Sequence, residues 1–184
     1  LAEDLKPNRL EAAKDVAAEF INGRPNDNIG ITLFAGETFT QCPLTVDHAV
    51  LLDMIHNIKC GLITDGTAVG MGIANAVTRL KDSKAKSKVI ILLTDGTNNK
   101  GDISPMTAAE IAKSFGIRVY TIGVGTNGMA PYPYPVGNTV QYVSMPVEID
   151  EKTLTEIAGT TDGNYFRATS NSKLKEVYEE IDKL

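Results

Sequence analysis

The sequence predicts an α/β fold, in which a doubly wound and mostly parallel sheet carries helices on both faces. Segments with helical spacing of apolar residues alternate with short strand-like segments over nearly all of the 184 residues. The run Val89 to Leu93 is continuously aliphatic, which is typical of a strand buried on both faces of a parallel sheet. Short right-handed connections would then place the intervening helices on the two faces of that sheet.

The first half of the chain contains the outer elements of this predicted fold. A helix runs from Leu10 to Ile21, and Asn8 is a suitable N-cap for it. Residues 28–35 read as a strand rich in Ile, Thr, Leu and Phe, and residues 38–42 return beside it as a hairpin. Two further helices follow, over residues 47–58 and 68–80.

The second half begins with the predicted central strand, Lys88 to Thr94. A helix follows from Pro105 to Phe115 and stops at Gly116, a residue type that is common just past helix ends. Residues 117–124 form the next strand. The last elements are a short helix through residues 154–158, a strand over residues 164–168 and a closing helix from Leu174 to Leu184.

One segment, residues 127–146, breaks this alternation. It contains prolines at 131, 133, 135 and 146 together with Tyr132 and Tyr134. Because proline is confined to edge strands and bulges, we expect a surface excursion with a short ribbon around Gly137-Asn138. Tyr132 and Tyr134 are candidate contacts for a protein partner, since exposed tyrosines often anchor interfaces. Tyrosines folded back onto their own loop are an equal alternative.

Composition indicates one globular domain over residues 1–184, with 42% hydrophobic and 22% charged residues. A net charge of -5 with scattered Lys and Arg excludes a nucleic-acid partner. No run approaches the roughly 20 apolar residues of a membrane helix, so this part is expected to be soluble, with any membrane contact through segments outside it. Because the chain starts at Leu1 without a Met, we expect it to come from a longer protein. Cys42 and Cys60 are expected to be unpaired thiols.

Two loops contain candidate metal ligands, Thr67 and Asp95. Asp95 follows the predicted central strand, and Thr67 opens the preceding helix. Taken singly, Asp95 could cap a turn or helix, and Thr67 could be an N-cap. Together, the helix–strand order puts both loops on one edge of the sheet, where their hard oxygens suit Mg²⁺, Mn²⁺ or Ca²⁺. The glycines after Asp65 match neither GxxxxGK[ST] nor GxGxxG, which disfavours a phosphate site.

These motifs resemble the von Willebrand factor A (integrin I-like) domain family in their order and spacing. The resemblance rests on the Gly66-Thr67 loop, the strand end Leu92 to Gly96, and the strand Val119 to Gly125. A closer likeness is to the bacterial Bat (aerotolerance) proteins. It is carried by residues 5–14, 39–45 and 65–72.

The resemblance implies a metal-ion-dependent adhesion site built from a DxSxS loop, a threonine loop and an aspartate loop. Thr67 matches the family threonine and Asp95 the family aspartate. The DxSxS loop and the first, central strand are not found in this sequence, and in Bat proteins they would lie immediately before Leu1. The chain as given is therefore expected to bind Mg²⁺, Mn²⁺ or Ca²⁺ weakly or not at all.

The function implied by the resemblance is binding rather than catalysis. A protein partner presenting a carboxylate, including other Bat-family proteins, would fill the open position on the metal. The parent protein would be anchored in the bacterial inner membrane, with this domain in the periplasm. Two alternatives stay open, a metal-free structural scaffold and a Mg²⁺-dependent nucleotide or phosphate hydrolase using Asp95. The absence of a P-loop and of a base near either loop argues against the hydrolase.

Overall fold

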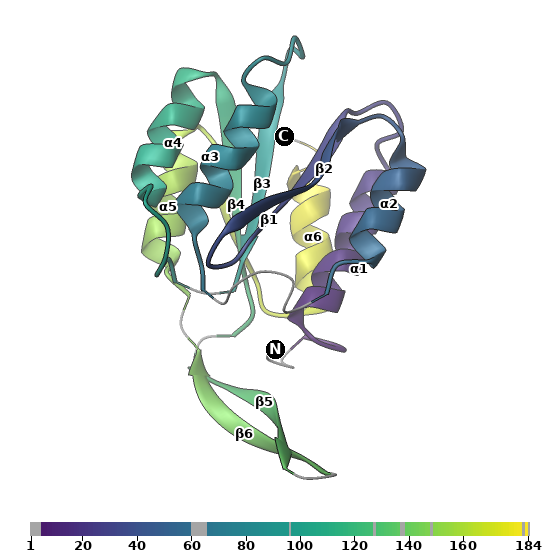
Figure 1. The fold of residues 1–184 in the computed structure, drawn as a ribbon, viewed down its shortest axis with the longest axis vertical. Helices are drawn as coiled ribbons and strands as arrows, with labels where there is room; N and C mark the ends of the chain where they lie inside the picture. The colour runs from purple at the N-terminus through teal and green to yellow at the C-terminus, as the bar shows by residue number, and fades with distance from the viewer. Residues whose placement is uncertain are drawn as a thin grey trace.

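A computed structural model describes residues 5–59, 66–95, 97–126, 128–136, 139–147, 149–181 and 183. The helices are α1 (Arg9–Asn22), α2 (His48–His56), α3 (Val69–Leu80), α4 (Pro105–Ser114), α5 (Glu151–Thr160) and α6 (Asn171–Ile181). The strands are β1 (Ile29–Phe34), β2 (Thr38–Thr45), β3 (Lys88–Thr94), β4 (Ile117–Val124), β5 (Gly128–Val136), β6 (Thr139–Val147) and β7 (Tyr165–Ala168). Figure 1 shows a layered body of helices and strands from which the β5–β6 ribbon projects.

The α/β fold expected from the sequence is confirmed, with its elements in the expected order. Local signals explain why several elements begin and end where they do. The Asn8 Oδ1 accepts a hydrogen bond from the Glu11 N–H at 3.1 Å and so caps α1, as the sequence predicts. Ser104 caps α4 in the same way, and Gly116 follows that helix with a positive φ of 64°.

The parallel part of the sheet consists of β3, β4 and β7, in that order. β4 lies in the middle and pairs in parallel with both neighbours, from Ile117 to Gly123 with β3 and from Thr121 to Val124 with β7. β1 and β2 form a separate antiparallel hairpin. Among the residues that the structure describes, no strand pairs with both β1 and β3, so the hairpin and the parallel strands are separate sheets.

A cavity of about 1120 Å³ lies between β1 and β3. Residues of β1 and β3 line it, together with residues of α1 and α3, which cover opposite faces of the body (Figure 1). The expectation that β3 is buried on both faces is wrong, because β3 lies beside this cavity. Ile90 and Leu92 are buried, whereas Ile91 and Leu93 are half-buried and Val89 is exposed. β3 is the edge of the described sheet, so side chains beside the cavity lack a neighbouring strand.

Two apolar layers hold the helices on the sheet. On one face, α3, α4 and α5 pack on β3 and β4, and Ile73, Ala109 and Ile157 are fully buried there. On the other face, α1 and α6 pack on β4 and β7 around Ile122 and Leu174. Because β4 contributes side chains to both layers, it is the buried centre of the body.

Of the two cysteines expected to be unpaired, the structure describes Cys42. Cys42 is free and buried beneath α2, within a small cluster that also contains Leu51 and Ile55. Burial raises the pKa of its thiol, so it is an apolar packing residue rather than a nucleophile. Cys60 lies outside the described residues.

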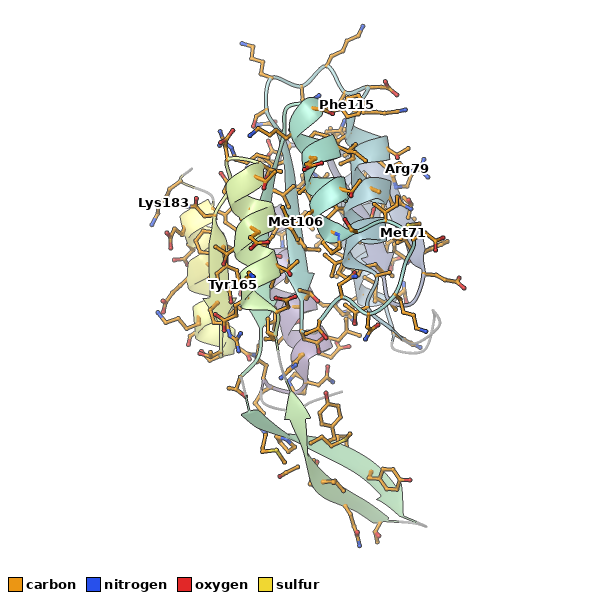
Figure 2. All side chains as sticks on the ribbon, turned by 90° about the vertical axis from the view of Figure 1, so that its left-hand side faces the viewer. Met71, Arg79, Met106, Phe115, Tyr165 and Lys183 are labelled. Atoms are coloured by element: carbon orange, nitrogen blue, oxygen red, sulfur yellow. The ribbon has the colours of Figure 1, made fainter. Side chains whose placement is uncertain are left out.

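The excursion predicted over residues 127–146 is a two-stranded antiparallel ribbon, β5–β6. Its strands pair from Gly128 opposite Val147 to Val136 opposite Thr139. The ribbon stands apart from the body in both views (Figures 1 and 2). The sequence thus indicated its surface position, but not that nearly all of the segment would be strand.

Thr161 provides a test of how α5 is fixed to the sheet. Its buried hydroxyl accepts a hydrogen bond from the Val119 N–H at 3.0 Å and donates to the Ile157 carbonyl at 3.1 Å. Thr161→Val leaves the buried N–H of Val119 without this acceptor. We expect the free energy of unfolding, measured by urea denaturation, to fall by about 1–3 kcal/mol.

The matched control for this change is Thr155→Val on the same helix. The exposed Thr155 hydroxyl donates only to the Glu151 carbonyl one turn earlier. We expect its loss to change the free energy of unfolding by less than about 0.5 kcal/mol. Equal effects of the two substitutions would show that the Thr161–Val119 contact does not stabilise the fold.

Candidate functional site

Asp95 lies immediately after β3, at the carboxyl edge of the parallel strands. The Arg9 Nη1 donates to the Asp95 carbonyl oxygen and to Asp95 Oδ2, each at 3.3 Å. The Arg9 side chain is only 3% exposed, whereas that of Asp95 is 44% exposed. One face of the carboxylate therefore meets a buried cation from the first turn of α1, and the rest remains open to solvent or a ligand.

Gly125 makes room for the Arg9 guanidinium at this edge. Gly125 has a φ of 113°, and a Cβ built on it would lie 2.4 Å from the Arg9 Cζ. Only glycine satisfies both the backbone angle and the close approach. The guanidinium is thereby held between the ends of β3 and β4. Arg9 was not among the site residues predicted from the sequence, although a basic residue in the first turn of a helix, where the dipole disfavours it, is a usable signal.

Thr67 lies on the loop that enters α3, and neighbouring asparagines hold its backbone. The Thr67 N–H donates to Asn99 Oδ1 at 2.9 Å, and its carbonyl accepts from the Asn99 N–H at 2.9 Å. Asn98 Oδ1 accepts from the Val69 N–H at 2.8 Å and so satisfies the first turn of α3. The N-cap position of α3 is Ala68, so the interpretation of Thr67 as an N-cap is wrong. None of the hydrogen bonds found among the described residues uses the Thr67 hydroxyl.

The structure brings the threonine and aspartate loops to the same cavity. Thr67, Asp95 and Arg9 all line the 1120 Å³ cavity between β1 and β3. The segment that follows Asp95 supplies the asparagines that bind the Thr67 loop, so the two loops are hydrogen-bonded to each other. Asp95 does not cap α4, because Ser104 does. Asp65 and Gly96, the neighbours of the two candidates, lie outside the described residues.

The two glycines in the first turn of α3 serve packing. A Cβ on Gly70 would lie 2.1 Å from the Ile103 carbonyl oxygen, and one on Gly72 would lie 2.9 Å from the Phe34 ring. Both positions therefore require glycine because α3 approaches its neighbours closely. Close packing therefore explains the glycines at positions 70 and 72 without a phosphate site.

Thr67 and Asp95 are the two candidate metal ligands that line the cavity. The Thr67 hydroxyl and the Asp95 carboxylate are oxygen donors of the kind that Mg²⁺, Mn²⁺ and Ca²⁺ prefer. In the described part of the chain, no cluster of three or more His, Cys, Asp or Glu residues could hold a metal ion. The Arg9 guanidinium also offsets the charge of Asp95. Two donors beside a fixed cation form a weak dication site unless further oxygens join them.

The two candidate contact tyrosines lie on β5, away from the cavity. Tyr134 is 63% exposed and pairs with Gln141, whereas Tyr132 is half-buried and pairs with Val143. Tyr134 thus has the exposure that an interface anchor needs, and Tyr132 is partly covered. Figure 2 shows this ribbon beyond the densely packed body that contains Met106 and Tyr165.

Comparison with known proteins gives consistent matches over the whole chain. The von Willebrand factor type A domain model matches residues 3–180. An aerotolerance-related membrane protein from Bacteroides fragilis is 33% identical, with a TM-score of 0.83 over 100% of this chain and 93% of that one. BatB from Bacteroides thetaiotaomicron is 34% identical, with a TM-score of 0.84 over 100% of this chain and 91% of that one.

A more distant structure is that of proximal thread matrix protein 1 from the mussel byssus, with zinc in its MIDAS motif. It is 25% identical, with a TM-score of 0.73, and the match covers 96% of this chain and 40% of that one. The chain spans about half the length of the curated relatives it matches, 52% and 56% for the first two. Within the described ranges, no helix has the length and apolar character needed to cross a membrane.

Gly125→Ala tests the close packing around Arg9. The added methyl group would meet the guanidinium, and the backbone would keep an angle that L-residues avoid. We expect a loss of about 1–3 kcal/mol in the free energy of unfolding, measured by chemical denaturation.

Gly159→Ala provides the control, because Gly159 lies in α5 with open space around its Cβ position. We expect this change to be neutral or to stabilise by up to about 1 kcal/mol. A Gly125→Ala protein as stable as the native one would contradict the placement of Arg9 against the end of β4.

Proposed function

The chain belongs to the von Willebrand factor type A domain family, and we propose that it is the metal-ion-dependent protein-interaction module of a Bat-like bacterial envelope protein. One observation carries this proposal. Thr67 and Asp95, from two loops that are hydrogen-bonded to each other, line one cavity, and Asp95 follows β3 at the carboxyl edge of the sheet. Ligands of open α/β sheets bind at this edge.

The roles of the two candidate ligands follow from their surroundings. The Thr67 hydroxyl has no role as a helix cap, and its backbone is fixed by Asn99, so it can offer its oxygen without unfolding α3. The Asp95 carboxylate offers its exposed face. A bound Mg²⁺, Mn²⁺ or Ca²⁺ would supply positive charge for a partner's carboxylate. Residues upstream of Leu1, which in Bat proteins include DxSxS, would complete the ligand set.

Arg9 acts as a positioning residue in this proposal. Its guanidinium is buried and holds the Asp95 carbonyl and carboxylate through one nitrogen. Before a metal binds, this contact balances the charge of Asp95 and limits its rotation. Binding a dication beside Arg9 would then require additional anionic ligands, so the two donors alone would form only a weak site.

The partner is proposed to be a protein that presents a carboxylate, such as another Bat-family protein. Tyr134, exposed on the ribbon, and its half-buried neighbour Tyr132 would add a second contact area on the ribbon, away from the metal contact. The Bacteroides fragilis relative is a membrane protein. This description supports a membrane-anchored parent, and we propose that the domain lies on the periplasmic side of the inner membrane.

Covalent catalysis is not part of this proposal. The ionic partner of Asp95 is Arg9, a permanent cation that cannot act as a general base. A hydrolase would need a base beside the carboxylate, and this contact favours a binding site instead. A metal-free scaffold remains the second candidate, favoured by the few metal donors among the described residues.

Calorimetric titration with Mg²⁺ and Mn²⁺ separates these two candidates. The chain as given should show weak or no binding, because two protein oxygens leave most of an octahedral shell to water. A longer version that includes the residues encoded before Leu1 should show clear binding. In that version, Asp95→Asn should abolish binding, and Thr67→Val, which removes only the hydroxyl, should weaken it at least about tenfold.

The control in the same titration is Asp82→Asn, which removes an exposed carboxylate on the loop before β3. It should bind both ions as the unaltered protein does. If the longer protein binds neither ion, or if Asp95→Asn binds as well as the control, the metal-dependent function is wrong and the scaffold takes its place.

A further inference from the structure

The two outer edges of the β5–β6 ribbon differ in their capacity to pair with another strand. β5 has prolines at positions 131, 133 and 135, opposite Ser144, Tyr142 and Val140 of β6. Proline has no N–H, so these three residues cannot donate to a ladder. In an antiparallel pair, alternate residues direct their N–H groups to opposite edges. The continuous β5–β6 pairing therefore requires the proline nitrogens to face away from β6.

The outer edge of β5 is consequently closed to strand addition. The residues between the prolines, such as Tyr132 and Tyr134, form the ladder with Val143 and Gln141. Three successive outward positions of β5 offer no donor. Proteins use proline in this way to protect exposed edges from pairing with other chains.

The outer edge of β6 is protected at one position only, by Pro146, which lies opposite Met129 at the base of the ribbon. Gln141 and Val143 face β5, so the N–H groups of Val140 and Ser144 point outward. β6 pairs with β5 and with no other strand in the described part of the chain. Residues 128–147 contain no Asp, Glu, Lys, Arg or His, so β6 also lacks the charged side chains that commonly protect an edge.

The ribbon also exposes several large apolar side chains to solvent. Tyr142 is 61% exposed, Met145 47% and Val143 46%. A two-stranded ribbon standing away from its body is only marginally stable by itself. An added strand beside β6 would cover this surface and complete the ladder.

We propose that β6 pairs antiparallel with β6 of a second copy of this chain, giving a four-stranded sheet in the order β5–β6–β6–β5. The same uncharged edge occurs on both copies, so the contact is self-complementary about a two-fold axis. Both outer strands of this sheet are then the proline-blocked β5, and the assembly closes at two copies. A strand from an unrelated protein would leave its own outer edge open to further pairing.

Charge and shape agree with this arrangement. Each copy has a net charge of -5, none of it on residues 128–147. In an antiparallel pair, the helix-covered bodies of the two copies lie at opposite ends of the paired β6 strands. Each β6 strand has 9 residues and spans about 30 Å, so the bodies are about that far apart. This separation exceeds the Debye length of about 8 Å in physiological salt, so repulsion between the bodies is screened. The dimer uses neither Thr67 nor Asp95 and is independent of the metal site.

Sedimentation velocity without added metal tests the dimer directly. The native chain should show a concentration-dependent monomer–dimer equilibrium. Tyr142 lies near the middle of β6. If the two copies of β6 pair about their middles, the Tyr142 residues of the two copies lie directly or diagonally opposite each other, about 5–8 Å apart. Tyr142→Lys and Tyr142→Glu should each reduce the dimer association constant roughly three- to tenfold, and an equimolar mixture of the two should restore it.

Met129→Lys is the matched control, because Met129 on β5 is 61% exposed, like Tyr142, but lies on the blocked strand. It should dimerise as the native chain does. A second variant, Val140→Pro with Ser144→Pro, removes two N–H groups that point outward from β6. It leaves in place the N–H groups of Gln141 and Val143, which belong to the β5–β6 ladder. It should lower the association constant by more than about tenfold, while the thermal transition of the body stays unchanged.

Several results would overturn the proposal. A native chain that stays monomeric at roughly millimolar concentration has no such dimer. Failure of the Lys and Glu variants to associate when mixed shows that Tyr142 is not near a two-fold axis. Association of the double-proline variant at native strength assigns the contact to another surface, such as the cavity between β1 and β3. Growth beyond two copies contradicts closure by the proline edge.

Discussion

The parallel ladder in which β4 pairs with β3 on one side and β7 on the other is the constraint on which the rest of the structure depends. Because the three strands are parallel, their carboxyl ends meet at one edge, and Asp95 and Gly125 follow β3 and β4 there. The ladder also presents two apolar faces, which fix α3, α4 and α5 on one side and α1 and α6 on the other. The placement of α1 delivers Arg9 to the edge where Asp95 lies.

Apolar periodicity was sufficient to predict the elements of the body. β3 and β4 have the bounds expected from the sequence, since an aliphatic run between polar turns has few alternatives. The burial of β3 could not be predicted in the same way. Burial depends on which strands lie beside it, and Val89 is exposed because one side of β3 faces a cavity. A pattern along one strand contains no information about which strands lie beside it.

The candidate site was less predictable than the fold because it depends on contacts between distant residues. The choice of Thr67 and Asp95 rested on topology, and the structure places both on one cavity. Arg9 lies 86 positions from Asp95 in the chain, and only the packing of α1 reveals their contact. Similarly, a hydroxyl before a helix suggests a cap, yet Asn98 from another loop bonds the first turn of α3 instead. Local rules fail where a distant side chain competes for the same donor.

The ribbon and the candidate metal site begin at the same edge of the sheet. β5 starts four residues after β4 ends, so the ribbon leaves the body from the edge that also holds Asp95 and Arg9 (Figure 1). A partner bound through its carboxylate at this edge would lie next to the base of the ribbon. Antiparallel pairing through β6 places two such edges at opposite ends of one four-stranded sheet. The pairing therefore leaves both sites accessible, and a dimer could engage two partner molecules at once, which raises avidity without any new contact at either site.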